Sequence, residues 1–332
     1  MSSILVPSSN FHWCDLKEFH SNPFLYLTDF NLVAIVILSR GKCGLSKCIT
    51  RYLVAMAAAD FAVIITDVIM HRINNMYFPV SFLFLTPVCS LRHVMYIVSL
   101  DCSVWFTVAF TFDRFIAICC HKLKPKYCTQ RTATVVISVV CVVSFLRSIP
   151  GFIVYKPLFV ISNVSWYCVG KSDYWTSTFW RAYECIDSIL TPVLPILFIL
   201  LFNALTVKNI IAANRARKGL RSKSENQNDT EMENWRKSIF LLFALSANFV
   251  LLWMTYLVHS LRWQLENFNY QNKYLNNPVY ITQQFGFMLQ VLSSSTNTCI
   301  YGLTQKKFRE ELKKGIKYLF TLNGKLVHTC TI

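Results

Sequence analysis

Long apolar segments alternate with short polar ones along the chain. A helix needs about 20 mostly apolar residues to cross the hydrocarbon core of a bilayer. Six stretches reach this length: residues 52–71, 94–120, 132–155, 185–211, 238–261 and 279–303. A seventh stretch, 24–38, is shorter and contains Asp29 and Asn31, so the alternative for this stretch is a segment at the membrane interface. The pattern predicts an all-α membrane protein, a bundle of seven transmembrane helices.

The residues after the last apolar stretch predict a helix on the membrane surface. In KKFREELKKGIKYLF (306–320), apolar residues recur every fourth position, with basic residues between them, at Phe308, Leu312, Ile316 and Phe320. Such a helix binds an anionic leaflet, and a solvated helix in a folded tail is the alternative. The predicted organisation is an extracellular N-terminus (1–23), a transmembrane domain (24–303) and an amphipathic helix with a cytoplasmic tail (304–332).

The chain is basic, with 33 Lys and Arg against 17 Asp and Glu. Most of the basic residues lie in the connections after the first, third, fifth and seventh apolar stretches. Because basic residues accumulate on the cytoplasmic side, the charge predicts a multi-pass protein of the plasma membrane, with an extracellular N-terminus and a cytoplasmic C-terminus. It does not indicate a nucleic-acid partner. Membrane lipids are the expected partner of the basic segments.

The common signatures of enzymes are missing from the sequence. It contains no Cys-x-x-Cys pair, zinc spacing, phosphate-binding glycine loop, His-Glu-x-x-His or Gly-x-Ser-x-Gly. We therefore expect no enzymatic activity and no required cofactor. A transporter or channel is an alternative function, but no inverted repeat relates the two halves and no pair of spans carries matched charges, which argues against it.

Charged residues inside apolar stretches are costly and usually functional. Asp60 lies in the middle of the second stretch, and Asp113 and Arg114 lie near the end of the third. Cys89 lies 25 residues before Arg114, about 37 Å along a helix, so these two residues mark opposite faces of the membrane.

The connection after the fourth stretch is expected outside the cell. It carries the glycosylation sequon Asn163-Val-Ser165, and Asn163 is the expected glycan site. It also carries Cys168, in a compartment where disulfides persist. A bridge from Cys89 to Cys168 would tie this connection over the third helix.

Several motifs occur in one order on successive stretches, and with them the chain resembles the rhodopsin-like G-protein-coupled receptors over residues 24–320. Two stretches look most like a small orphan branch of this family that has been linked to aromatic amino acids: RYLVAMAAAD and RTATVVISVVCVVSFLRSIP. The resemblance implies a receptor that binds an extracellular small molecule or peptide and activates a heterotrimeric G protein. The matching residues are Asn31, Asp60, Cys89, Asp113-Arg114-Phe115, Pro195, Phe249, Trp253, and Asn297 with Tyr301.

The chain also departs from the family pattern. Thr255 and Thr298 stand where the family has proline, and the usual tryptophan of the fourth span is missing. Proline kinks helices, so the sixth and seventh helices are expected to bend less or differently. A seven-helix receptor that binds without signalling is therefore a second alternative.

The resemblance implies a switch at the cytoplasmic end. Arg114 would pair with Asp113 at rest and turn to the G protein on activation, with Asn297 and Tyr301 as further switch residues. The alternative is an arginine that reaches the headgroups, with Asp113 beside it by coincidence.

The resemblance also implies an allosteric sodium ion in the bundle. Its ligands would be Asp60, Ser103, Ser293 and Asn297, all with the oxygen atoms that a hard cation prefers. The alternative is a protonated Asp60 that is hydrogen-bonded across helices.

A transmission cluster and a ligand pocket follow from the same resemblance. Val104, Pro195, Phe249 and Trp253 would pass a packing change towards the cytoplasm, with an ordinary aromatic core as the alternative.

The acidic lining residues of the ligand pocket, with Arg92, Arg181 and Arg262 near the rim, suit a zwitterion or polar peptide, and an aromatic amino acid is the suspected ligand. For each lining residue plain interhelical packing is the alternative; Tyr96, at the position of the acid in amine receptors, argues against a biogenic amine. The candidate lining is Asp67, His71, Tyr96, Asp187, Trp253, Tyr256, Gln283 and Phe287.

Overall fold

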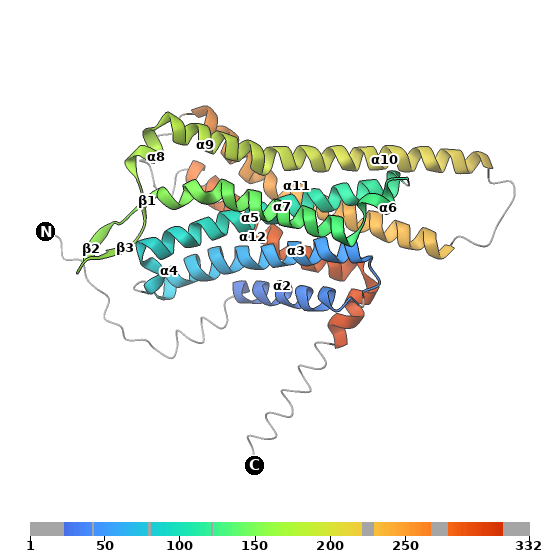
Figure 1. Cartoon of the computed structure of the whole chain (residues 1–332), viewed down its shortest axis with the longest axis horizontal. Coiled ribbons are helices and arrows are strands. Elements are labelled where there is room, and N and C mark those ends of the chain that lie inside the picture. The colour runs from blue at the N-terminus through green and yellow to red at the C-terminus, as the bar shows by residue number, and fades with distance from the viewer. Residues whose placement is uncertain are drawn as a thin grey trace, which may run out of the picture.

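The computed structural model describes residues 23–41, 43–78, 81–120, 122–220, 229–266 and 278–314. Long helices run side by side along one axis (Figure 1). All seven predicted stretches are helical within the described ranges. They are α2 (Pro23–Ser39), α3 (Lys47–Val63) with η1 (Ile64–Ile73) and α4 (Asn74–Tyr77), α5 (Thr86–Cys119), α7 (Gln130–Ser148) with η3 (Ile149–Ile153), α9 (Thr178–Ser188) with η4 (Ile189–Val193) and α10 (Leu194–Leu220), α11 (Asp229–Glu266) and α12 (Pro278–Thr304).

Five of these segments are long and apolar enough to cross a membrane, judged by length and composition over the described residues. In the first helix the described apolar part is only Phe30–Ser39. The last helix, α12, carries Gln290, the serines 293–295 and Asn297, which lower its hydropathy. The five segments are Lys47–Tyr77, Thr86–Cys119, Gln130–Ile153, Thr178–Ala212 and Ile239–Arg262.

The helices extend past the apolar stretches that predict them. α5 begins at Thr86 rather than at residue 94, with a proline in its first turn, where the missing N–H costs nothing. α3 begins at Lys47 rather than at residue 52, and the hydroxyl of its cap, Ser46, accepts a hydrogen bond from the Ile49 amide at 3.3 Å. A proline in the first turn and a capping serine thus mark these two helix starts, and hydropathy alone does not locate them.

One helix is broken within its span. Thr191 has an extended backbone conformation (φ −151°, ψ 101°), and Pro192 follows it, so α9 and α10 meet at a kink. Pro195 lies just beyond the kink, in the first turn of α10. In contrast, α11 and α12 continue as α-helix through Thr255 and Thr298, as expected for helices that lack the family's prolines.

The connection between α7 and α9 contains short strands, which the all-α prediction does not include. β1 (Tyr155–Lys156) pairs with β4 (Val169–Gly170), and β2 (Phe159–Ile161) pairs with β3 (Val164–Trp166). The turn of the inner hairpin has positive φ angles at Ser162 (50°) and Asn163 (62°), as two-residue hairpin turns require. A five-residue helix, α8 (Ser172–Thr176), leads into α9. The sequon residue Asn163 is therefore exposed at a hairpin tip.

α5 lies in the middle of the bundle and contacts α3, α7, α10 and α11 (Figure 1). α7 has the opposite character: Val139, Val142, Val143 and Leu146 are exposed on its outer face. Apolar side chains on the outside and packed polar groups on the inside are what a lipid environment favours. We call the end of the bundle with the hairpins the disulfide end, and the end where residues 305–314 follow α12 the tail end.

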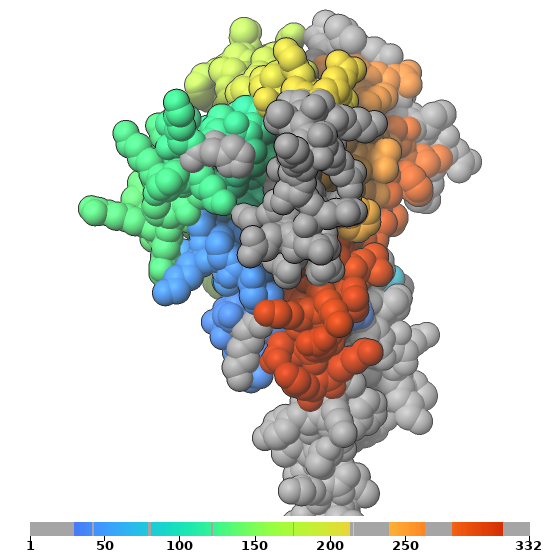
Figure 2. Space-filling model, turned by 90° about the vertical axis from the view of Figure 1, so that its right-hand side faces the viewer, coloured from blue at the N-terminus to red at the C-terminus, as the bar shows by residue number. Residues whose placement is uncertain are grey.

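A short helix at residues 306–314 covers part of the tail end. Phe308 is fully buried, and its ring lies 6.2 Å from that of Tyr301. Arg309 Nη1 donates to the carbonyls of Gly302 (3.1 Å) and Leu303 (2.8 Å), which caps the end of α12. Seen from this end, the last described residues (red) lie beside the beginning of the bundle (blue) (Figure 2). Here the Lys307 side chain covers Gly44 in the α2–α3 connection. Ile316 and Phe320 lie outside the described residues.

Candidate functional site

The pair Asp113–Arg114 is buried near the tail end of α5, with 6% of each residue exposed. Arg114 Nη2 forms an ion pair with Asp113 Oδ2, and its guanidinium carbon lies 5.9 Å from the centre of the Phe110 ring. In the described part of the chain, Arg114 Nε has no hydrogen-bond partner. The guanidinium therefore depends on one carboxylate from its own helix and retains an unused donor.

Two thiols hold the other side of Asp113. Cys48 Sγ, from the first turn of α3, donates to Asp113 Oδ1 at 3.1 Å. Cys128, just before α7, places its Sγ 3.6 Å from the Asp113 carbonyl oxygen. Burial, together with the nearby Asp113, raises the pKa of Cys128 to about 11, so its thiol stays protonated. The sequence contains no signal for these contacts, because single cysteines in apolar surroundings look like small core residues.

Asp60 lies fully buried between α3, α5 and α12. Asn297 Nδ2 donates to its Oδ2 at 2.8 Å, and the Ser103 hydroxyl donates to its Oδ1. The third partner is the hydroxyl of Ser294, not of Ser293, although both residues precede Asn297 by about one turn. The carboxylate and hydroxyl oxygens at this position fit a sodium ion, and the site fits a proton equally well.

The same region joins the first and last helices. Asn31 Nδ2 donates to the Ser294 carbonyl at 3.0 Å, and Thr298 Oγ1 donates to Asn31 Oδ1 at 2.8 Å. Thr298, which replaces the family's proline, thus forms an interhelical hydrogen bond that proline lacks the donor to make. The Tyr301 ring is buried one turn further on, and its hydroxyl has no partner in the described part of the chain.

A packed apolar cluster lies between α5, α10 and α11. It consists of Val104, Val108, Ile196, Ile199, Phe249 and Trp253. Its aromatic rings continue towards α12, with centroid distances of 5.2 Å (Phe249–Trp253), 6.0 Å (Trp253–Tyr256) and 5.7 Å (Tyr256–Phe287). The predicted member Pro195 is buried next to Ile196. The structure thus brings the predicted transmission residues and two predicted lining residues into one continuous set of contacts.

The remaining candidate lining residues come from several helices. Asp67 accepts from Arg72 Nε at 2.7 Å and lies 3.5 Å from His71 Nδ1, so this acid is already paired on its own helix. Tyr96 interacts electrostatically with Asp67 and with Tyr256. Gln283 is half-buried, without a described side-chain contact.

A second ionic cluster connects three helices, and Asp187 is its only member among the predicted site residues. Arg147 of α7 forms an ion pair with Asp101 of α5, and its Nη2 donates to Thr191 Oγ1 at 3.1 Å. Thr191 Oγ1 in turn donates to Asp101 Oδ1 at 3.0 Å. Arg147 Nε also lies 3.6 Å from Asp187 Oδ1. The prediction that no two spans carry matched charges is therefore wrong, since Asp101 and Arg147 lie within the apolar stretches 94–120 and 132–155.

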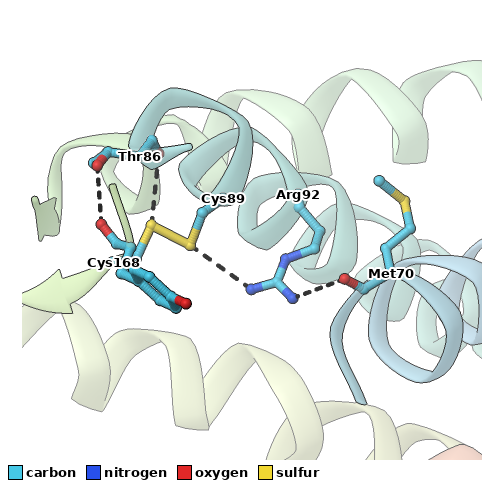
Figure 3. Close-up of a disulfide and its surroundings, with 6 residues drawn as sticks. Met70, Thr86, Cys89, Arg92 and Cys168 are labelled. Carbon is cyan, nitrogen blue, oxygen red and sulfur yellow. Dashed lines mark hydrogen bonds between the residues drawn. A yellow bond between two sulfur atoms is a disulfide. The ribbon is translucent and has the colours of Figure 1, made fainter. Parts of the chain in front are cut away.

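A disulfide joins Cys89, in the first turns of α5, to Cys168 beside β4, with 6.4 Å between their Cα atoms. Thr86 Oγ1 donates to the Tyr167 carbonyl at 2.9 Å and reinforces the same link. Arg92 reaches from the disulfide to the second helix: its Nη2 lies 3.8 Å from Cys89 Sγ, and its Nη1 donates to the Met70 carbonyl at 3.4 Å (Figure 3). These contacts of the Arg92 guanidinium are to neutral groups.

Comparison with known proteins gives a consistent match. The family model described as "7 transmembrane receptor (rhodopsin family)" matches residues 30–301. The thyrotropin-releasing hormone receptor of Gallus gallus is 25% identical over 311 residues, which are 86% of this chain and 74% of the relative. The receptor of the same name from Ovis aries is 25% identical over 86% of this chain and 73% of its own length. G-protein coupled receptor 182 of Homo sapiens is 22% identical over 92% of this chain and 72% of its own.

Proposed function

The chain belongs to the rhodopsin family of seven-transmembrane receptors, and from this premise we propose how it binds its ligand and passes on the signal. It is a multi-pass membrane receptor that binds an extracellular ligand and signals through a G protein. Family membership thus selects a receptor over the alternative of a transporter or channel.

The disulfide end faces the outside of the cell, and the receptor works at the plasma membrane. Two features support this orientation. The disulfide Cys89–Cys168 belongs to an oxidising compartment, and the exposed sequon at Asn163 lies at the same end. The basic connections lie at the other end, as the positive-inside rule expects. The tail end is then the side that meets the G protein.

The ligand carries an ammonium group that binds at Asp187. This proposal depends on one observation: one guanidinium, Arg147, serves two carboxylates. Arg147 is paired with Asp101 and lies 3.6 Å from Asp187, whose side chain is 31% exposed. Asp187 therefore has room for a second cation. The rings of Tyr256, Trp253 and Phe287 form a contact series in the same half of the bundle and would take an aromatic group.

The other charge of the ligand is a carboxylate that binds Arg92. This arginine is half-buried and contacts the neutral Met70 carbonyl and the disulfide sulfur. A zwitterion with an aromatic side chain combines the three features, so we propose a free aromatic amino acid or a short aromatic peptide. Two of the relatives are receptors for thyrotropin-releasing hormone, which is compatible with a small diffusible ligand.

Arg114 is the switch of the signalling state. At rest it pairs with Asp113, which Cys48 holds from the neighbouring helix. On activation it leaves Asp113 and meets the G protein, while the contacts from Trp253 through Val104 change their packing. Asn297 and Tyr301 take part through the last helix. Asp60, Ser103, Ser294 and Asn297 would hold a sodium ion, which would supply the positive charge that the buried Asp60 lacks.

The ligand proposal is tested by nucleotide exchange on a purified G protein. Aromatic amino acids and dipeptides are compared with their N-acetyl and C-amide forms. Asp187→Asn should weaken the response to the free amine about tenfold to hundredfold, because it removes a charged partner. It should leave the N-acetyl form, already weak, unchanged. Asp173→Asn, an exposed acid of α8, is the matched control. Equal responses to the free and acetylated forms would contradict the proposal.

A further inference from the structure

Arg147, Asp101 and Thr191 form a closed triangle of polar contacts inside the bundle. Each pair of corners is joined: Arg147 with Asp101, Arg147 with Thr191, and Thr191 with Asp101. The side chains of Asp101 and Arg147 are 3% and 16% exposed, so these charges are largely withdrawn from water and from headgroups. Ionisable residues are rare inside membrane spans and are usually retained for function. The triangle is therefore expected to have a function.

The triangle lies where a span is broken in the described part of the chain. Thr191 is the residue with the non-helical backbone, immediately before Pro192. Its side chain is fixed by two helices other than its own, because Asp101 belongs to α5 and Arg147 to α7. Tyr183 of α9 adds a further contact, since its hydroxyl donates to the Arg147 carbonyl at 3.1 Å. The angle between α9 and α10 is thus held from outside the kinked helix.

The triangle also lies between two regions with different tasks. On one side Arg147 Nε approaches Asp187, the proposed ligand contact. On the other side, Asp101 is followed three residues later by Val104 and Thr191 five residues later by Ile196, and both of these belong to the apolar cluster with Trp253. A shift of Arg147 towards or away from Asp187 would change its contacts with Thr191. It would thereby move the start of α10 against the cluster.

We propose that Arg147, Asp101 and Thr191 act as a positioning unit, which holds the α9–α10 kink and couples occupancy at Asp187 to the packing cluster around Trp253. A cation at Asp187 competes with Arg147 for that carboxylate and leaves Arg147 wholly to Asp101 and Thr191. Buried ion pairs lie close to energetic balance, so a modest change in partners is enough to shift between two arrangements. The coupling rests on the proposed ligand site, whereas the fixing of the kink does not.

The test compares a variant that loses only the arginine with a variant that loses both charges of the pair. Arg147→Met leaves the buried Asp101 carboxylate without a cation, so we expect about a tenfold loss of folded receptor. The double variant Asp101→Asn with Arg147→Met leaves no deeply buried charge unpaired, because only the partly exposed Asp187 loses its cation, and it should return to within about twofold of the unmodified receptor. At matched amounts of folded receptor, the double variant should still differ about fivefold in basal nucleotide exchange, measured with the G-protein α-subunit fused to the receptor.

A single-hydroxyl variant sharpens the test. Thr191→Val removes two contacts of the triangle and should change basal exchange about threefold, with folding nearly intact. Thr107→Val is the matched control, because the buried Thr107 hydroxyl bonds only the Ser103 carbonyl of its own helix among the contacts described. If the double variant and Thr191→Val both exchange nucleotide like the unmodified receptor, the triangle only stabilises the fold and the proposal is wrong.

Hydrogen exchange separates this proposal from the proposed function. The amides of residues 189–191, 193 and 194 should exchange about tenfold faster in the double variant than in the unmodified receptor, because the kink has lost its external contacts. If the fused receptor shows no nucleotide exchange at all, the signalling mechanism fails, and the amide rates alone decide on the positioning unit. Unchanged amide rates would overturn it.

Discussion

Two buried aspartate–arginine pairs have their aspartate on α5, and they differ in the helix that supplies the arginine. Arg114 is the direct neighbour of Asp113 on the same helix. Arg147 comes from α7 and meets Asp101 across a helix interface. A pair within one helix can exchange partners by side-chain rotation alone. A pair between helices cannot separate without moving a helix or leaving a charge buried.

The other contacts of the two aspartates also differ between the pairs. Asp113 is held from a neighbouring helix by a thiol of Cys48, a weak donor. Asp101 is held by the Thr191 hydroxyl as well as by Arg147, and a second carboxylate, Asp187, lies near. The tail-end pair is thus suited to switching and the other pair to anchoring. The two roles predict effects of different size.

The largest difference is expected in stability. Arg147→Met should lower the free energy of unfolding by about 3–5 kcal/mol, because an uncompensated carboxylate remains in the interior. Arg114→Met should lower it by only about 1–2 kcal/mol, because Asp113 lies near the bundle end, where its charge is closer to water. Thermal unfolding of both purified variants in one detergent measures the difference. Equal losses would remove the distinction between the two pairs.

A smaller effect is expected from the thiol beside the switch. Cys48→Ala removes the donor to Asp113 Oδ1 and should raise basal nucleotide exchange about two- to threefold, because the resting pair loses a weak hydrogen bond. Cys48→Ser retains a donor and should behave like the unmodified receptor. The control is Cys43→Ala, a buried thiol that bonds only the Ile37 carbonyl among its described contacts. A rise in Cys48→Ser as large as in Cys48→Ala would exclude the hydrogen bond as the cause.

The smallest effect is expected from an exposed pair. Lys314 Nζ lies 2.7 Å from Glu311 Oε1 on the tail-end helix, and 72% of the lysine side chain is exposed. Exposed pairs contribute little, because water and salt screen them. Lys314→Ala should therefore change neither the unfolding temperature nor nucleotide exchange measurably. A clear effect of this substitution would show that burial is not what distinguishes the three pairs.

The helices and the Asp113–Arg114 pair follow from the sequence because each is a local property. A span needs only a run of apolar residues, and Arg114 needs only its neighbour to be seen as one half of a pair. Asp101 and Arg147 are distant in the chain, and each alone resembles an isolated charge near a membrane surface. Only the packing of α5 against α7 makes them partners. Charges within the apolar stretches indicate both residues in the sequence, but they do not indicate that the two residues pair.

The other differences have similar causes. Ser294 rather than Ser293 reaches Asp60 because neighbouring positions on a helix differ by about 100°, and only packing selects between them. The strands between α7 and α9 are two or three residues long, too short for an alternating pattern to be recognised. The Thr191 conformation results from Pro192 and from side chains on two other helices, so the sequence around residue 191 alone does not specify it.

Nucleotide exchange by Arg114→Ala tests the switch most directly. The variant and the unmodified receptor are reconstituted at equal amounts of folded protein with one heterotrimeric G protein, and exchange is followed without ligand and with an activating aromatic zwitterion. We expect both basal and ligand-driven exchange to fall about tenfold or more, while ligand binding remains close to that of the unmodified receptor. If exchange of both kinds persists at the original rate, Arg114 does not contact the G protein in the way proposed.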